Sequence, residues 1–446
     1  MVINLPVEVQ GIIEKLEANG YEAFIVGGCV RDSLRFVAPK DWDVCTLALP
    51  EQTMNVFAGE NVIETGLQHG TVTVVINHKP FEITTYRSDG MYSDSRHPDS
   101  VEFLTDIKGD LSRRDFTINA MAYSPNAGVV DFFGGMADLK NGILKCVGDP
   151  NVRFQEDALR ILRAMRFAST LGMMVEENTA KAMIGNRSLL GRISAERIAC
   201  EFNYMIEGAG VYEAFTGYTA ILLEIIPELA PALGFEQNNP HHCYDVFTHT
   251  LKSIESAPKD LAVRLALLFH DIAKPNCYSQ ENGIGHFFGH QQTGLETAEK
   301  VLSRLKYDND TIAAVKELVL YHDAEIQPDS KNIKRWLNRI GETRLSQLVE
   351  VKRADVMAQT EHYRQERLEI LKDVSGIIDE IIEQQQCFSL KDLAVTGREI
   401  MEIGIPPGPQ MGKMLKLLVD MVIDEQVDNN KEELINVAVQ RAELMK

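Results

Sequence analysis

The chain has 446 residues, 45% of them hydrophobic and 25% charged, and a formal net charge of −20 at pH 7. This length predicts two to four domains of ~100–150 residues, and the composition is typical of soluble globular proteins. The acidic balance argues against a protein that coats nucleic acid non-specifically, because neutralising phosphates needs an excess of Lys and Arg. A local basic groove remains compatible with it.

The sequence carries no signal for a membrane or a secretory pathway. No segment approaches the ~20 consecutive apolar residues of a membrane helix. The first twenty residues, MVINLPVEVQGIIEKLEANG, carry acids among the apolar positions, which favours a helix over a signal peptide. Seven scattered cysteines form no CxxC pair. We therefore expect a cytoplasmic protein whose cysteines fill core positions.

The hydrophobic pattern changes its period along the chain. Residues 1–135 alternate helical patterns with short β-type runs at Ala23–Val26, Val44–Leu47, Thr71–Ile76, Phe81–Tyr86 and Val129–Phe133. From about Asn151 the period is helical, with amphipathic segments at 156–170, 194–208, 260–274, 293–305 and 310–322. We therefore predict an α+β protein: a mixed-sheet N-terminal part followed by an all-α remainder.

A glycine turn and two aspartates make the first candidate site. The segment AFIVGGCVRDSLRF predicts a strand, a turn at Gly27-Gly28 and a short helix, whose free N–H groups could bind a phosphate. Most Gly-Gly pairs are only turns, so this pattern is weak by itself. Twelve residues later come Asp41 and Asp43, and an i, i+2 pair on a strand points to one face. Paired carboxylates favour Mg²⁺ and phosphoryl transfer, with an exposed acidic strand end as the alternative.

A third carboxylate is a candidate for the same site. The runs Thr71–Ile76 and Phe81–Tyr86 predict a hairpin joined by residues 77–80, and Glu82 alternates there with Phe81 and Ile83. Glu82 is thus either a catalytic carboxylate beside the aspartate pair or a solvent-facing strand residue, and the pattern favours neither.

The spacing of the glycine turn and DWDV resembles the polymerase-β-type nucleotidyltransferase superfamily. A narrower resemblance follows along the chain: GGCVRD (27–32), RSDGMYSDSRHPDSVEF (87–103), LSRRDFTINAMAY (111–123), DFFGGMADL (131–139) and EDALRILRAMRFA (156–168) are similar, in order, to the motifs of bacterial class II CCA tRNA nucleotidyltransferases and related poly(A) polymerases. The resemblance implies template-independent addition of C, C and A to tRNA from CTP and ATP. Poly(A) or CC addition are the alternatives, and the segment 87–98 favours full CCA addition by its resemblance to a loop that A addition requires.

The EDALR segment is the candidate for base selection. Asp157, Arg160, Arg163 and Arg166 lie at steps of three on a predicted helix, where acceptor and donor groups could match a base edge. An Asp157–Arg160 salt bridge is the plain structural alternative. The resemblance implies that Asp157 and Arg160 act as a protein template. It also implies nucleotide contacts from Gly28, Arg31, Arg114, Arg163 and Arg166.

The helical remainder carries an ordered set of histidines and aspartates. An adjacent His-Asp pair within the apolar segment LALLFHDIAK is unusual, since buried polar groups need partners. The set resembles the HD phosphohydrolase superfamily. That resemblance implies one divalent metal, Mn, Ni or Co, on His249, His270, Asp271 and Asp355, a second metal near His290 and His322, and a substrate phosphate at Lys274.

We predict four parts: a nucleotidyltransferase head (1–138), a helical neck that selects nucleotides (139–230), an HD-type metal-binding body (231–375) and a helical tail (376–446). The tail resembles that of the same enzymes and is expected to bind tRNA, although a helical cap without RNA contact fits its composition equally well. A metal phosphohydrolase with a degenerate front half is the rival from another class. The intact DWD and EDALR segments count against it.

Overall fold

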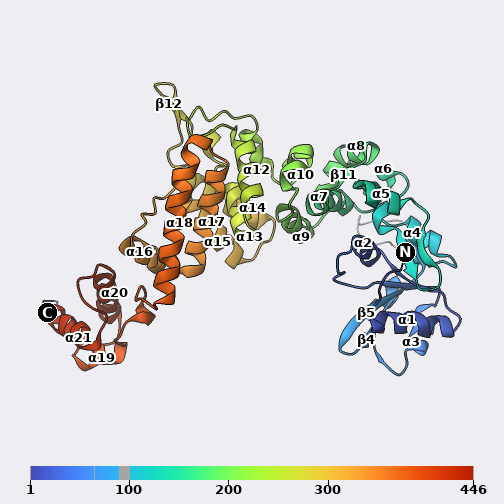
Figure 1. The fold of residues 1–446 in the computed structure, drawn as a ribbon, viewed down its shortest axis with the longest axis horizontal. Coiled ribbons are helices and arrows are strands. Elements are labelled where there is room, and N and C mark those ends of the chain that lie inside the picture. The colour runs from blue at the N-terminus through green and yellow to red at the C-terminus, as the bar shows by residue number, and fades with distance from the viewer. Residues whose placement is uncertain (1, 65, 90–100, 445–446) are drawn as a thin grey trace. The chain divides into compact units, whose positions relative to one another are not determined.

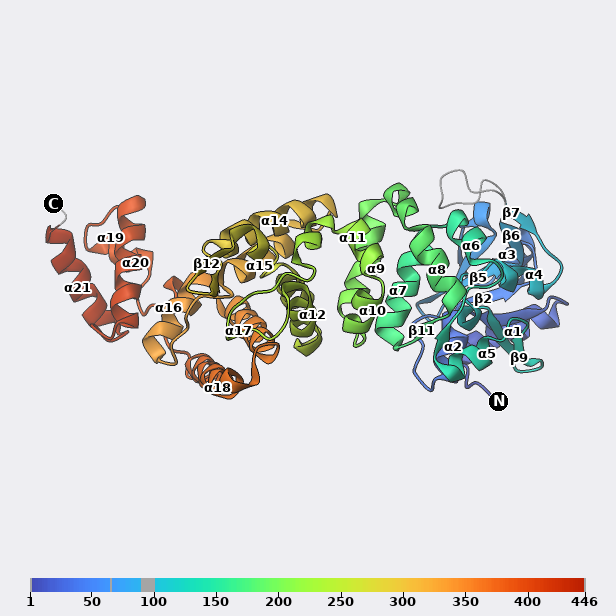
Figure 2. The same cartoon turned by 90° about the horizontal axis from the view of Figure 1, so that it is seen from above.

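The computed structural model describes residues 2–64, 66–89 and 101–444, and the chain forms two compact units, Met1–Pro227 and Glu228–Lys446 (Figures 1 and 2). The four-part division predicted from the sequence is finer than these two units and stays a prediction. Most of the segment 87–98 that favoured full CCA addition lies outside the described residues. Within those residues, no helix has the length and apolar character needed to cross a membrane.

A seven-stranded mixed sheet organises the first half of unit 1. Its strand order is β3-β4-β5-β2-β1-β8-β9, and β2 and β5 run parallel while the other neighbours run antiparallel. The strands are β1 (Ala23–Val26), β2 (Val44–Thr46), β3 (Asn61–Ile63), β4 (Thr71–Ile76), β5 (Lys79–Thr85), β8 (Met121–Ser124) and β9 (Gly128–Asp131), and a separate pair is β6 (Arg87–Asp89) with β7 (Val101–Phe103). This sheet and the helices after it confirm the predicted α+β class.

Apolar residues cover both faces of the sheet, which explains why β1 is buried at every position. Ile25 packs in one core with the apolar face of α1 (Val7–Ala18), and Phe24 packs in the other core with Leu111 of α4 (Ile107–Ser112). Figure 1 shows α1 and α3 (Pro50–Val56) beside β4 and β5. A strand buried on both faces reads as a continuous apolar run, as AFIV does.

The observed strands refine the predictions at the hairpin. The runs at Ala23–Val26 and Thr71–Ile76 form strands with the predicted bounds, but β5 begins at Lys79. Asn77 and His78 have φ values of 51° and 63° and alone make the turn, because Lys79 already pairs with Ile76. Positive φ at both central residues is the geometry that matches hairpin twist. The expected four-residue connection was therefore wrong. Strands β3, β6, β7 and β8 were not predicted.

The second half of unit 1 is helical, and Figure 2 shows α7, α9 and α10 as neighbours. Its helices are α5 (Gly135–Asn141), α6 (Pro150–Glu156), α7 (Leu159–Leu171), α8 (Glu177–Gly185), α9 (Ala195–Ile206), α10 (Val211–Gly217) and α11 (Thr219–Ile225). The single helix predicted over 156–170 is wrong at its start. Asp157 is extended, with φ −138°, and its carboxylate accepts the Leu159 N–H at 3.0 Å, so it ends α6 and caps the turn into α7.

Unit 2 is a helical bundle followed by a small C-terminal cluster with its own core. Its helices are α12 (Val246–Ser256), α13 (Leu261–Phe269), α14 (His290–Arg304), α15 (Asn309–Tyr321), α16 (Ser330–Ile340), α17 (Glu342–Met357), α18 (Glu361–Glu383), α19 (Gly397–Glu402), α20 (Pro409–Ile423) and α21 (Lys431–Leu444). A hairpin of β12 (Ser279–Glu281) and β13 (Ile284–His286) joins α13 to α14. Helix α13 packs against α12, α15 and α17 and is buried from Val263 onward, as its mostly apolar sequence predicts. Its one charged residue, Arg264, donates to the carbonyls of Pro258 and Ala257 at 2.9 Å.

Candidate active site and metal centre

Three carboxylates converge beside strands β2 and β5. Asp41 and Asp43 immediately precede β2, and the Asp43 carbonyl accepts the Val26 N–H at 3.0 Å, which extends the ladder to this residue. The parallel register places Val44 beside Ile83, so the preceding residue, Glu82, lies next to Asp43. All three carboxylates line one cavity of about 670 Å³.

The electrostatics of Asp43 fit a cation at this place. Burial of the carboxylate raises its pKa, and the charges of Glu82 and Asp41 act in the same direction, while Arg114 opposes them. The side chain still reaches solvent at the cavity. Like charges held together in this way are stabilised by a divalent cation, and oxygen ligands suit Mg²⁺. The carboxylate set therefore fits the predicted magnesium site.

A second cavity, of about 420 Å³, is lined by arginines and shares Asp43 with the first. The residues expected to contact a nucleotide all line it: Gly28, Arg31, Arg114, Asp157, Arg160, Arg163 and Arg166. They come from α2 (Gly28–Leu34), from the turn after α4, and from Asp157 and α7. Guanidinium groups at this density attract a polyanion such as a triphosphate.

The glycine turn shapes the wall between sheet and cavity. Gly27 has φ 75° and ψ −128°, a conformation that side-chain-bearing residues rarely adopt. A Cβ at this position would lie 2.9 Å from Nη1 of Arg114, whereas one on Gly28 would make only an ordinary contact with Arg31 at 3.7 Å. Gly27 is therefore needed for its backbone conformation, and an added Cβ would also displace the Arg114 guanidinium.

Buried acids hold the arginines in place, and sequence reasoning missed them. Asp110 is fully buried and accepts from Arg113 at 2.8 Å and from Arg114 at 3.2 Å. Burial alone would raise the pKa of Asp110, but the charges of Arg114 and Arg113 and their hydrogen bonds lower it below its usual value. The carboxylate therefore stays ionised and fixes both guanidinium groups.

Asp115 likewise fixes guanidinium groups in the arginine-lined cavity. It pairs with Arg163 at 3.0 Å and accepts from Asn119 at 3.1 Å, and Asn119 in turn accepts from Arg31 at 2.7 Å. Burial opposes ionisation of Asp115, but the Arg163 charge prevails and lowers its pKa. The i, i+4 spacing of Asp115 and Asn119 was visible in LSRRDFTINA, but their arginine partners are far away in the sequence.

The two residues proposed as a template do not pair with each other here. Asp157 pairs with Arg197 of α9 at 3.3 Å, and Arg160 pairs with Glu156 at 2.6 Å. The alternative of an Asp157–Arg160 salt bridge therefore does not describe this structure. Arg160, which is 8% exposed, also donates to the Arg113 carbonyl at 3.1 Å. The partner Arg197 was not predicted, because it lies 40 residues away.

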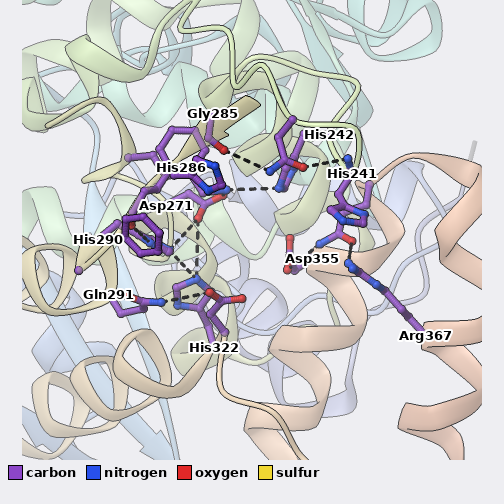
Figure 3. A pocket seen from close by; sticks show the side chains of 17 residues that line it. His241, His242, Asp271, Gly285, His286, His290, Gln291, His322, Asp355 and Arg367 are labelled. Carbon is purple, nitrogen blue, oxygen red and sulfur yellow. Dashed lines mark hydrogen bonds and ion pairs between the residues drawn. The ribbon is translucent and has the colours of Figure 1, made fainter. Parts of the chain in front are cut away.

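The histidines of unit 2 converge on a buried centre, and Figure 3 shows two of them, His290 and His322, with Asp271. In each of His249, His270, His290 and His322, Nδ1 faces a backbone carbonyl at 2.7–3.3 Å, and a carbonyl can only accept, so Nδ1 carries the proton. Each Nε2 lone pair then points inward. His249 and His270 bring theirs within 3.4 Å, and His290 and His322 within 3.2 Å. Lone pairs at these separations repel unless a cation lies between them, so the donor set fits metal ions.

Two groups of three ligands are present among the described residues. One is His249, His270 and Asp355, and the other is Asp271, His290 and His322. Asp271 faces both groups: its Oδ2 lies 3.2 Å from His270 Nε2 and its Oδ1 lies 3.6 Å from His290 Nε2. The sequence interpretation allotted Asp271 to the first metal, whereas this geometry lets one carboxylate bridge two.

Most of the protonation states at this centre suit metal binding. Burial lowers the pKa of His290, and it lowers that of His322 to about 3, so both imidazoles are neutral at pH 7. Burial also opposes the charged form of His270, but Asp271 prevails and raises the pKa of that imidazole. Burial opposes ionisation of Asp271 and Asp355, but the neighbouring histidines prevail and lower the pKa of each carboxyl. Neutral imidazole and ionised carboxylate are the forms that ligate metals.

A cavity of about 460 Å³ opens onto this centre. Buried Lys274 lies in it and donates to Asp271 Oδ2 at 2.7 Å and to Gln237 at 2.8 Å, so the predicted phosphate-binding lysine is next to the ligands. His241, His242 and His286 also line the cavity. Burial, with the charge of Lys274, lowers the pKa of His242 to about 3.

Comparison with known families connects the chain to RNA-processing nucleotidyltransferases. Residues 23–145 match the family "Poly A polymerase head domain", residues 172–233 match "Probable RNA and SrmB- binding site of polymerase A", and residues 279–438 match "tRNA nucleotidyltransferase domain 2 putative". Two relatives, each described as a CCA-adding enzyme, come from Lactiplantibacillus plantarum (31% identical over 98% of each chain) and Lactobacillus delbrueckii subsp. bulgaricus (33% over 94% of each).

Solved structures agree with this grouping. The Bacillus stearothermophilus CCA-adding enzyme in complex with CTP is 26% identical and covers 98% of each chain, with a TM-score of 0.69. The Thermotoga maritima CCA-adding enzyme complexed with tRNA is 16% identical, covers 98% of this chain and 96% of its own, and has a TM-score of 0.58. The second likeness concerns the fold alone.

Proposed function

The chain belongs to the family of CCA-adding enzymes, and from that membership we propose that it adds C, C and A to the 3′ end of tRNA, using CTP and ATP without a nucleic-acid template. One structural observation supports the proposed roles of the individual residues. The cavity lined by Asp43 also contains every residue expected to contact the nucleotide. A nucleotide bound among the arginines would have its phosphates beside the carboxylates.

The reaction follows from this arrangement. The 3′-hydroxyl oxygen of the RNA attacks the α-phosphorus of CTP or ATP, the bond from that phosphorus to the bridging oxygen breaks, pyrophosphate leaves, and the hydroxyl proton passes to solvent. Asp41, Asp43 and Glu82 would hold Mg²⁺, which when bound would supply Lewis acidity for phosphoryl transfer. Arg31 and Arg114 bind and orient the triphosphate.

Selection of the base is assigned to Asp157 and Arg160. An ionised Asp only accepts hydrogen bonds and an Arg only donates, so together they can match the edge of cytosine or of adenine. Both side chains are held by protein partners, Arg197 and Glu156. Arg163 and Arg166 complete the wall of the cavity beside them.

Incubation of the purified protein with Mg²⁺, CTP, ATP and tRNA that ends at the discriminator base tests the proposal. Sequencing of the products distinguishes the rivals. Termination after CCA supports the proposal, CC alone indicates a divided pathway, and a long A tail favours poly(A) polymerase. Asp41→Ala should abolish addition while tRNA binding persists, and a wild-type rate in this variant would remove the carboxylate site.

A second activity, metal-dependent phosphohydrolysis in unit 2, is supported by a specific observation. Inward-facing Nε2 atoms and two carboxylates form two ligand groups next to Lys274, in the order that resembles HD phosphohydrolases. Imidazole and carboxylate ligands suit Mn, Ni or Co. Phosphate release from phosphomonoesters, or ring opening of 2′,3′-cyclic phosphates, with these metals is the test. No turnover of either substrate type with any of the three would refute the proposal.

The remaining expectations follow from the same assignment. We propose that unit 1 comprises the head (1–138) and the neck (139–230) as far as Pro227, and that unit 2 comprises the last neck residues, the HD-type body (231–375) and a tail (376–446) that binds tRNA. A cytoplasmic location agrees with a tRNA substrate. Deletion of residues 384–446, which leaves α18 whole, should raise the Kd for tRNA, and an unchanged Kd would assign the tail a structural role only.

A further inference from the structure

The rim of the unit 2 cavity carries an aromatic pair, half-buried His286 and exposed Phe288, that the metal chemistry does not explain. His286 and Phe288 both line the cavity, and their rings are stacked with centroids 5.5 Å apart and planes inclined by 3°. The Phe288 side chain is 77% exposed. Single exposed aromatic residues are ordinary on protein surfaces, but a pair of parallel rings at the mouth of a polar cavity is a ready stacking surface.

The pair is tied closely to the metal ligands. Phe288 precedes the ligand His290 by two residues, which limits the separation of their Cα atoms to about 7 Å. His290 Nδ1 donates to the Phe287 carbonyl at 2.7 Å, so the backbone between the two aromatic rings is bonded to a ligand. Figure 3 shows His286, Asp271 and His290 around this pocket.

The hairpin β12–β13 holds the pair in place. The register pairs Ser279 with His286 at the open end of the hairpin, and the Gly285 N–H donates to the Asn238 carbonyl at 2.8 Å. A Cβ on Gly285 would lie 2.2 Å from the Gln237 carbonyl, so the hairpin packs directly on that backbone. Gln237 also accepts from Lys274, and one segment therefore positions both the rim pair and the lysine.

The charges of the cavity specify what reaches the metal ions. Its lining has three carboxylates, Asp271, Asp323 and Asp355, against Lys274 and Arg367. An anion therefore enters favourably only with the divalent ions bound, which makes the inner end a phosphate site. The volume, about 460 Å³, lies in the range of small-molecule pockets.

We infer that His286 and Phe288 are specificity residues that stack a nucleobase, so that this site acts on nucleoside monophosphates in preference to phosphomonoesters without a base. The inference rests on the phosphohydrolase proposed above. Water attacks the phosphorus, the P–O ester bond breaks, and the leaving oxygen takes up a proton released by the water. The products are a nucleoside and inorganic phosphate.

The test measures phosphate release from adenosine 2′-, 3′- and 5′-monophosphates and from β-glycerol phosphate, which has no ring to stack, with Mn²⁺ present. Phe288→Ala should lower kcat/KM for the preferred adenosine substrate by roughly 5- to 10-fold, mainly through KM, and leave β-glycerol phosphate unchanged. Phe288→Tyr should restore the wild-type value. Ile284→Ala, which truncates a 43% exposed residue of the same hairpin outside the cavity lining, is the matched control.

The outcomes distinguish a failure of the stacking role from a failure of the hydrolase itself. Equal losses on both substrates, or no loss on the adenosine substrates, overturn the stacking role while leaving the hydrolase intact. No turnover of any substrate by the wild type refutes the hydrolase instead. Photolabelling with 8-azido-adenosine monophosphate then tests stacking alone: label within 284–290 that Phe288→Ala abolishes supports it, and label confined to other segments overturns it.

Discussion

Replacing Gly27 with alanine tests how the glycine turn supports nucleotide binding. Gly27 has φ 75° and ψ −128°, where a side chain costs about 1–3 kcal/mol. At about 2–4 °C per kcal/mol for a unit of this size, we expect the Tm of unit 1 to fall by about 2–12 °C.

The same substitution should impair substrate binding beyond this strain. The new Cβ would lie 2.9 Å from Arg114 Nη1, so the guanidinium must retreat by about 0.5 Å to reach the 3.4 Å of ordinary contact. Because Arg114 is also bonded to Asp110 at 3.2 Å, this movement strains a buried ion pair. A displacement of ~1 Å at a reacting centre can cost ~100-fold, so we expect KM for CTP to rise about 10-fold.

Steady-state incorporation of CTP into tRNA lacking its 3′ end measures this effect. Gly20→Ala is the control, because Gly20 also has a positive φ, 85°, and no atom lies within 4 Å of its added Cβ. It should lower Tm and leave KM unchanged. Equal KM values in both variants would refute the role given to the Gly27–Arg114 contact.

Three further predictions concern single polar side chains. Arg160→Ala should lower the preference for CTP over UTP by about 10-fold or more in kcat/KM ratios, since a charged donor to the base is lost; an unchanged ratio would contradict the template role. Asp110→Asn should lower the unfolding free energy by about 2 kcal/mol at pH 7, because a buried partner of two arginines loses its charge. Since the folded pKa of Asp110 is depressed, this contribution is full above the unfolded value of about 3.9 and disappears as pH falls through the lower folded value. The Tm values of wild type and variant should therefore converge as the pH falls below the folded pKa of Asp110. A Tm difference that stays constant with pH would exclude this link between ionisation of Asp110 and stability. Asp271→Asn should weaken Mn²⁺ binding about 10-fold or more and lower the stoichiometry at both ligand groups, as measured by elemental analysis, without affecting CCA addition.

The hydrophobic patterns predicted the strands and helices that meet the core in a regular way, on both faces or along one stripe. Strand β1 is buried on both faces and reads as an uninterrupted apolar run, and α9 has a regular apolar stripe. Such periods depend only on which face meets the core, so they can be recognised without a partner. The end of α6 at Asp157 was missed, because a capping side chain competes locally with a helix whose period continues beyond it.

The order of residues along the chain by itself determined the α+β class, the acidic pairs, the arginine row and the spaced histidines, because chemistry-bearing residue types and their spacing are local properties. Only the tertiary structure decided which of them meet. Long-range packing pairs Asp157 with Arg197 and Asp115 with Arg163, and it turns Asp271 toward two ligand groups. These contacts join separate helices and strands, and their geometry arises from how those elements pack.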